Sequence, residues 1–277
     1  MISKIFHLPL ILVSLYISVR RCPFKTNKER RHLFWILLKL NFLKSSKPKG
    51  EFVRFRILDY DIYAYDYISL LNLVNEIFIN GEYLFESETA SPKILDCGAN
   101  IGMAALFFKK LFPGAEIVCF EPNPLSYKLL EMNVRGNDLQ HVTIINKAVA
   151  DEVGKLDFFI GNEKGSVIAS LSEDRNNTSR ISVDAIRLSE FIGERKFDLA
   201  KIDVEGAEHA VINDLILDNK INSIGEFMIE YHHMVDKKNT RLAEFLEKME
   251  RSGFLYNVRA KYRRIGNYQD IFFHFYN

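Results

Sequence analysis

Small and acidic residues recur where buried strands of this sequence are expected to end. The segment Asp96–Gly102 (D-C-G-A-N-I-G) follows a short apolar strand and opens an apolar helix. Gly98 permits a sharp turn and a close approach of a ligand to the backbone, and the helix N-terminus offers free N–H groups. Glu121 lies nineteen residues after Gly102, at the end of the next strand, where a carboxylate can accept hydrogen bonds from two ribose hydroxyls. The spacing therefore predicts a site for a nucleoside-containing ligand.

The composition of the loop separates two classes of such ligand. A dinucleotide loop follows G-x-G-x-x-G because pyrophosphate needs three close approaches, whereas this loop follows D-x-G-x-N-x-G. The carboxylate of Asp96 would repel a pyrophosphate, but it suits the ammonium group of S-adenosylmethionine. We therefore expect S-adenosylmethionine as the cofactor. An NAD-binding oxidoreductase and a purely structural turn are the alternatives.

The elements that position these residues follow an alternating pattern. Short apolar strands are expected over 93–96, 116–120, 142–146, 197–202 and 226–229. Helical patterns occur over 70–80, 103–112, 124–134, 206–217 and 242–249. This alternation predicts an α/β, Rossmann-like fold with a mostly parallel central sheet and helices on both faces. Residues 52–57 and 62–65 predict a hairpin, 154–160 an antiparallel return strand, and 255–258 and 271–276 the final strands, antiparallel at the C-terminus.

Three motifs in this order resemble the FkbM family of S-adenosylmethionine-dependent methyltransferases. They are Ile94–Gly102, Phe120–Pro124 (F-E-P-N-P) and Lys201–Glu208 (K-I-D-V-E-G-A-E). The similarity extends over roughly residues 83–230 and leaves the N-terminal arm outside. It implies a class I methyltransferase fold and an O-methyltransferase acting on a sugar, a glycan, a lipid-linked saccharide or a secondary metabolite.

The resemblance also implies which residues hold the cofactor. The first motif would surround its methionine part, Glu121 its ribose and residues 146–148 its adenine, while Asp203 would face the methyl group. The implied cofactor-binding residues are Asp96, Gly98, Ala99, Asn100, Gly102, Glu121, Pro122, Asn146, Lys147, Ala148 and Asp203.

Methyl transfer to oxygen calls for a base, because a neutral hydroxyl is a weak nucleophile. The candidate catalytic residues are Asp203, Glu205, Glu230 and His232. His232 has a suitable ordinary pKa, whereas the carboxylates would need a raised pKa, which clustering can supply. The same carboxylates would suit magnesium, but the sequence does not fix three such ligands in space, and we expect no metal. Glu205 and Glu208 are also expected in the first turn of a helix, where the dipole alone favours acids.

The charge of the 277-residue chain is unevenly distributed. Residues 1–50 hold eleven Lys or Arg and one acid, whereas residues 51–277 hold 26 basic and 35 acidic residues, and the net charge is +1. A basic arm predicts an anionic partner, and an acidic body makes nucleic acid a poor candidate. Three cysteines exclude a disulfide scaffold and indicate a cytoplasmic protein.

The arm contains two apolar stretches, 5–19 and 33–43, separated by a basic cluster. The first would span about 22 Å as a helix, short of the roughly 30 Å hydrocarbon core, and it lacks the flanks of a signal peptide. We expect residues 1–43 to bind an anionic membrane surface, which makes the protein peripheral to the inner face of the membrane. Packing of both helices on the body is the alternative. A linker at 44–50 would lead into a methyltransferase domain over 51–277, and a non-catalytic membrane-associated module with this fold is a further alternative.

Overall fold

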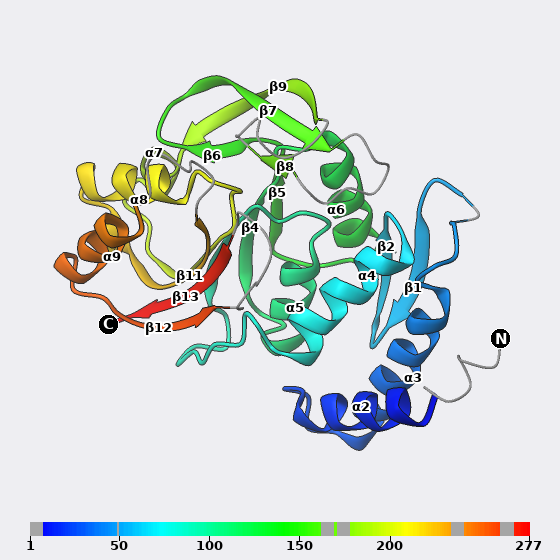
Figure 1. Ribbon diagram of the computed structural model, residues 1–277. Coiled ribbons are helices and arrows are strands. Elements are labelled where there is room, and N and C mark those ends of the chain that lie inside the picture. The colour runs from blue at the N-terminus through cyan, green and yellow to red at the C-terminus, as the bar shows by residue number, and fades with distance from the viewer. Residues whose placement is uncertain (1–7, 49, 162–168, 171–177, 234–240, 261–268) are drawn as a thin grey trace. The chain divides into compact units, whose positions relative to one another are not determined.

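The computed structural model describes residues 8–48, 50–161, 169–170, 178–233, 241–260 and 269–277 (Figure 1). The chain forms two compact units. One comprises Met1–Glu86 with Glu131–Asp138, and the other comprises Ser87–Leu130 with Leu139–Asn277. The expected boundary near residue 50 lies inside the first unit and stays a prediction.

The first unit contains two N-terminal helices, a hairpin and a third helix. The helices are α2 (Leu8–Arg21) and α3 (Asn27–Leu43), and the expected hairpin is confirmed as the antiparallel pair β1 (Val53–Ile57) and β2 (Tyr60–Ala64). Thr26 caps α3, because its Oγ1 accepts a hydrogen bond from the backbone N–H of Glu29 at 3.2 Å. The helix expected at 70–80 begins earlier, as α4 (Tyr67–Leu73), and continues as the π-helix η1 (Val74–Ile79). Within the described part of the chain, no helix combines the length and the apolar character needed to cross a membrane.

The second unit is built on a seven-stranded sheet with the order β12-β13-β11-β10-β3-β4-β5. Its strands are β3 (Lys93–Cys97), β4 (Glu116–Phe120), β5 (Val142–Ile145), β10 (Phe197–Ile202), β11 (Ile224–His233), β12 (Leu255–Ala260) and β13 (Gln269–Tyr276). The first five are parallel to one another, and β13 is antiparallel to both of its neighbours. The predicted α/β fold with a mostly parallel sheet and an antiparallel C-terminal strand is confirmed.

Helices connect the strands of this sheet, as the alternation predicted. They are α5 (Met103–Leu111), α6 (Pro124–Gly136), α7 (Leu188–Ile192), α8 (Glu208–Leu217) and α9 (Leu242–Arg251), with a 3-10 turn, η2 (Ile221–Ser223), before β11. Helix α8 begins only at Glu208, so Glu205 precedes the helix instead of lying in its first turn as expected. The backbone of Glu205 has φ +56°, a left-handed conformation that a helical turn does not contain.

The strand order reverses between β3 and β10. From β3 the chain builds outward through β4 to β5, and it later returns through β10 on the other side of β3. Cys97 and Ile202 are register partners at the carboxyl ends of these two strands. In open α/β sheets the ligand binds outside the carboxyl ends of the strands at this reversal, so the residues that follow Cys97 and Ile202 are placed to share one site.

A second sheet of four strands has the order β6-β9-β7-β8 (Figure 1). It contains β6 (Ala148–Ala150), β7 (Gly154–Gly161), β8 (Ala169–Ser170) and β9 (Thr178–Arg187). The return strand expected at 154–160 is present as β7, and its main partner is β9, which the sequence interpretation did not include. Ile181, Val183 and Ala185 are more buried than the residues between them, so β9 follows the alternation of a half-buried strand.

Candidate active site

Two glycines bring the loop after β3 close to its neighbours. Gly98 has φ +83°, and a Cβ built on it would lie 1.8 Å from the carbonyl oxygen of Asp203. Gly102 has φ +85°, and its Cβ would lie 2.7 Å from Cδ1 of Leu130 in α6. The positive φ favours glycine at both positions, and at Gly98 the backbone of Asp203 also leaves no space for a Cβ. At Gly98 the result is direct backbone contact between the loops that end β3 and β10.

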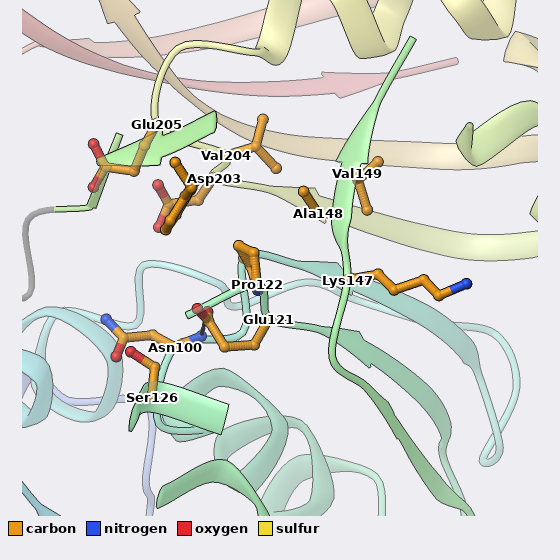
Figure 2. A pocket seen from close by; sticks show the side chains of 12 residues that line it. Asn100, Glu121, Pro122, Ser126, Lys147, Ala148, Val149, Asp203, Val204 and Glu205 are labelled. Carbon is orange, nitrogen blue, oxygen red and sulfur yellow. Dashed lines mark hydrogen bonds between the residues drawn. The ribbon is translucent and has the colours of Figure 1, made fainter. Parts of the chain in front are cut away.

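These loops border a pocket in the second unit (Figure 2). Asp203 and Glu205 occupy one side of the view, and Asn100, Glu121 and Ser126 the other. Eight of the predicted site residues line it: Gly98, Asn100, Glu121, Pro122, Lys147, Ala148, Asp203 and Glu205. Four further lining residues were not predicted: Ser126, Val149, Phe158 and Val204. Asp96, Ala99, Gly102, Asn146, Glu230 and His232 are not among the lining residues.

Glu121 at the end of β4 organises the pocket as well as lining it. Its Oε2 accepts a hydrogen bond from the backbone N–H of Asn100 at 2.7 Å, and its Oε1 accepts one from that of Asn123 at 2.8 Å. Burial raises the pKa of the Glu121 carboxyl to about 7, against the lowering effect of these two N–H groups. Asn146, which does not line the pocket, holds the backbone of Glu121, since its Nδ2 donates to the carbonyl oxygen of Glu121 at 2.7 Å.

The buried Lys201 contacts both the loop that follows β3 and the loop that follows β10. Nζ of Lys201 in β10 donates to the carbonyl oxygen of Gly98 at 2.6 Å and lies 3.3 Å from Asp96 and 3.5 Å from Asp203. Burial alone would lower the pKa of Lys201, but Asp96 and then Asp203 raise it above its ordinary value. Burial raises the pKa of Asp96, and Lys201 opposes that rise. Asp96 thus lies beneath the loop with Lys201 as its counter-ion.

His232 near the end of β11 is surrounded by carboxylates. Its Nδ1 donates to Oε1 of the buried Glu208 at 2.8 Å, while its Nε2 lies 3.3 Å from Oε2 of Glu205 and 3.9 Å from Oδ1 of Asp203. Burial would lower the pKa of His232, but Glu208, followed by Glu205 and Asp203, raises it well above the ordinary value. Glu208 therefore orients a ring whose other nitrogen faces two residues of the pocket wall.

The sequence profile described as the Methyltransferase FkbM domain matches residues 96–256. The chain belongs to the FkbM methyltransferase family. Membership makes the protein a methyltransferase, and its cofactor is S-adenosylmethionine.

Three curated relatives agree with this assignment. Methyltransferase sdnD of Sordaria araneosa is 28% identical over 54% of this chain and 70% of its own length. The 2-O-methyltransferase NoeI of Sinorhizobium fredii (strain NBRC 101917 / NGR234) is 32% identical over 45% of this chain and 58% of its own. The 31-O-demethyl-FK506 methyltransferase FkbM of Streptomyces tacrolimicus is 29% identical over 50% of this chain and 66% of its own. The chain thus spans between 58% and 70% of the length of these three relatives.

The pocket of this FkbM methyltransferase has unfilled hydrogen-bonding capacity that fits the cofactor. Oδ1 of Asn100 is buried and accepts no hydrogen bond from the described residues. A buried acceptor without a donor is costly, and the cofactor carries an ammonium group and two ribose hydroxyls as donors. Ala148, Val149 and Phe158 supply an apolar wall of the kind that suits an adenine ring.

Among the described residues, two groups have the composition of a divalent-cation site. Asp203, Glu205 and His232 offer ligand atoms that all lie within 4.8 Å of one another, and so do Glu230, His232 and Asp270. The structure thus places the other three predicted catalytic residues, Asp203, Glu205 and Glu230, close to His232. The expectation that no metal takes part stays a prediction.

Besides the four unpredicted lining residues, the sequence interpretation missed Lys201 and Glu208, which contact the predicted site residues. Lys201 offered a signal, because a charged residue between the apolar Leu199–Ala200 and Ile202 has a buried partner as its usual explanation. Glu208 had been explained by the helix dipole, and only its contact with His232, 24 positions further along the chain, identifies it.

Proposed function

We propose that this methyltransferase transfers a methyl group to a hydroxyl of a sugar, a glycan, a lipid-linked saccharide or a secondary metabolite. The observation that carries the proposal is the position of His232, whose Nε2 faces the pocket residues Asp203 and Glu205 while Glu208 holds its Nδ1. A histidine oriented in this way is suited to removing a proton from an acceptor hydroxyl. The names of two relatives, which specify a 2-O-methyltransferase and a 31-O-demethyl-FK506 methyltransferase, agree with an oxygen acceptor.

The roles of the side chains follow from their positions. When bound, S-adenosylmethionine supplies a methyl group on a positively charged sulfonium. Asp203 and Glu205 present carboxylates to that side of the pocket, where they favour a positive charge and can accept a hydrogen bond from the acceptor hydroxyl. His232 can take the hydroxyl proton on Nε2 only when its ring is neutral, and because the neighbouring carboxylates raise its pKa, kcat should rise with pH. The carboxylate of Glu208 stabilises the imidazolium that forms.

Replacement of His232 tests this proposal. We expect His232→Asn to lower kcat by about 10²–10⁴-fold, the usual contribution of a positioned base, with the Kd for S-adenosylmethionine nearly unchanged. Calorimetry measures the Kd, and methyl transfer from labelled cofactor to a panel of free and lipid-linked saccharides measures kcat. His141→Asn is the matched control, because His141 is exposed and has φ +60°, a conformation that asparagine tolerates.

The outcomes separate the alternatives. An unchanged kcat in His232→Asn would remove the histidine from the mechanism and leave a carboxylate as the base. Cofactor binding without transfer to any acceptor would favour a non-catalytic module, and binding of NAD in place of S-adenosylmethionine would favour an oxidoreductase. Full activity in EDTA is expected, and its loss with restoration by Mg²⁺ or Mn²⁺ would assign a metal to the cluster around His232.

We also propose that residues 1–43 hold the enzyme at the cytoplasmic face of a membrane, where lipid-linked acceptors are found. The charge of the arm and its apolar helices support this location. At low ionic strength the protein should sediment with membranes, and high salt should release part of it.

A further inference from the structure

We propose that α2 and α3 form a binding site for the anionic headgroup of a membrane phospholipid, with the exposed side of α2 inserted among the neighbouring acyl chains. The inference deepens the proposed membrane association and rests on it. It is independent of methyl transfer, since every residue involved belongs to the first unit.

The exposed side of α2 is apolar. Leu10, Val13 and Ile17 recur at helical spacing, and their exposed fractions are 68%, 57% and 44%. Tyr16, 59% exposed, adjoins them. The described residues include fourteen exposed large hydrophobic side chains, and seven of them lie between positions 10 and 42. Exposure on this scale in one short segment marks an interaction surface.

Helix α3 adds aromatic and basic side chains with the same exposure. Trp35 and Phe42 are 64% and 67% exposed. Arg31 lies one turn before Trp35 and is also exposed. Tryptophan and arginine together are typical of helices that lie in the headgroup region of a bilayer.

A cavity of about 450 Å³ is formed by residues of α2 and α3. This volume is within the usual range for a small-molecule site, roughly 300–1,000 Å³. Its lining contains three arginines and no acidic residue: Tyr16, Val19, Arg20, Asn27, Arg30, Arg31, Phe34 and Trp35. Arginines with an aromatic wall suit a phosphate that carries an organic substituent.

The combination of cavity and surface favours a lipid over other anions. A free phosphate or an RNA backbone would use the arginines but would leave the apolar side of α2 in water. The 14 residues of α2 extend about 21 Å at 1.5 Å per residue, which is too short to span a bilayer but suits a helix lying in its plane. An anionic phospholipid at the membrane interface satisfies both the charge and the apolar side chains.

The chain contains its own probe for this site. Trp35, a lining residue, is the only tryptophan in the sequence. Vesicles of 70% phosphatidylcholine and 30% phosphatidylglycerol should shift its emission to shorter wavelength and bring the full-length protein into the vesicle pellet. Vesicles of phosphatidylcholine alone should do so weakly, and glycerol 3-phosphate without a bilayer should not cause the shift.

Two double substitutions separate the contribution of the arginine charges to vesicle binding from that of the apolar side chains. Arg20→Gln with Arg31→Gln removes two cationic charges and should weaken binding to the anionic vesicles about thirtyfold, at roughly tenfold per 1.4 kcal/mol and about 1 kcal/mol per charge. Leu10→Ser with Val13→Ser should weaken binding to both compositions. The matched controls are Arg251→Gln for charge and Leu217→Ser with Leu255→Ser for exposed apolar area, and all three side chains lie in the second unit.

Three results would overturn the proposal. One is the absence of both the Trp35 shift and co-sedimentation with anionic vesicles. Another is a shift caused equally by glycerol 3-phosphate or by an RNA oligonucleotide, which would assign the arginines to a soluble anion. The third is a concentration-dependent dimer that Leu10→Ser with Val13→Ser dissociates, which would assign the apolar side of α2 to a second copy of the chain. Cofactor binding without vesicles should be unchanged in every arm variant, so failure here is distinct from failure of the methyltransferase proposal.

Discussion

The two sides of the pocket that we propose to hold the cofactor (the cofactor side) and to face its methyl group (the methyl side) are built differently. On the cofactor side, the charged groups Asp96 and Lys201 have side chains that are 0% and 4% exposed, and they pair with each other beneath the loop. On the methyl side, Asp203 and Glu205 are each 26% exposed, and they lie 3.9 Å and 3.3 Å from Nε2 of His232. The first pair of charges is thus fully buried, whereas the second pair of carboxylates is partly exposed to the pocket. We therefore expect substitutions in the first pair to affect mainly stability and substitutions of the exposed carboxylates to affect mainly turnover.

The largest effect on stability should come from Lys201→Met. Without the ammonium group, the carboxylate of Asp96 is buried with no counter-ion, and removing one partner of such a pair costs about 3–5 kcal/mol of unfolding free energy. Urea unfolding of the apoprotein measures this loss. Adding Asp96→Asn to the same chain should recover most of it, and a Lys201→Met protein that loses less than about 1 kcal/mol would contradict the structural role.

The next effect is on cofactor affinity. Glu121→Gln should weaken binding of S-adenosylmethionine at pH 8 by about 1.5–3 kcal/mol, the usual contribution of hydrogen bonds to a charged group. Calorimetric titration measures it. Glu116→Gln is the matched control, because Glu116 lies at the other end of β4 and is exposed. Equal affinities for the Glu121→Gln and control proteins would show that the ribose does not contact Glu121.

The pKa of Glu121, about 7, predicts opposite pH dependences for stability and affinity. Because burial raises this pKa, the native apoprotein binds more protons than the unfolded chain between the ordinary glutamate range and pH 7, so its stability should fall as pH rises through that window. Ribose hydroxyls donate to the ionised carboxylate, so cofactor affinity should rise over the same window, by at most about tenfold per pH unit. In Glu121→Gln, stability and cofactor affinity should both depend less on pH. A wild-type affinity that is constant from pH 6 to 8 would contradict a role of the Glu121 carboxylate in binding the ribose.

The smallest effect on stability should come from Glu205→Gln on the methyl side. Its carboxylate is partly exposed, and ion pairs of that kind contribute about 0–1 kcal/mol to stability. We nevertheless expect a lower kcat, since Glu205 faces both the pocket and His232. Unfolding and turnover measured on one preparation would show both changes. A large loss of stability with unchanged turnover would remove the distinction between the two sides.

The sequence predicted the strands of the seven-stranded sheet well because each parallel strand contains a short apolar run, such as Ile94–Leu95 in β3 and Met228–Ile229 in β11. It did not predict β9, whose inward residues Ile181, Val183 and Ala185 are separated by the polar or charged Ser182 and Asp184 and follow a polar segment. The four-stranded sheet depends on pairing between β7 and β9, and no local pattern specifies that pairing.

The site was predictable where its residues are contiguous in the chain. The loop after β3 contains its glycines within a few positions, so its conformation could be inferred locally. The pairings of Lys201 with Gly98 and of Glu208 with His232 join residues 103 and 24 positions apart. Such partners are defined only once the strands are ordered, which is why Lys201 and Glu208 were missed.

The backbone contact between Gly98 and Asp203 has a consequence for synthesis of the protein. Between Gly98 and Asp203 the chain forms β4, β5 and the whole four-stranded sheet. The contact can therefore form only when a loop of about a hundred residues closes. A nascent chain that ends before Phe197 has the glycine loop but lacks β10, and therefore lacks one wall of its pocket. We therefore expect the cofactor to stabilise the protein fully only after β10 has emerged and paired with β3.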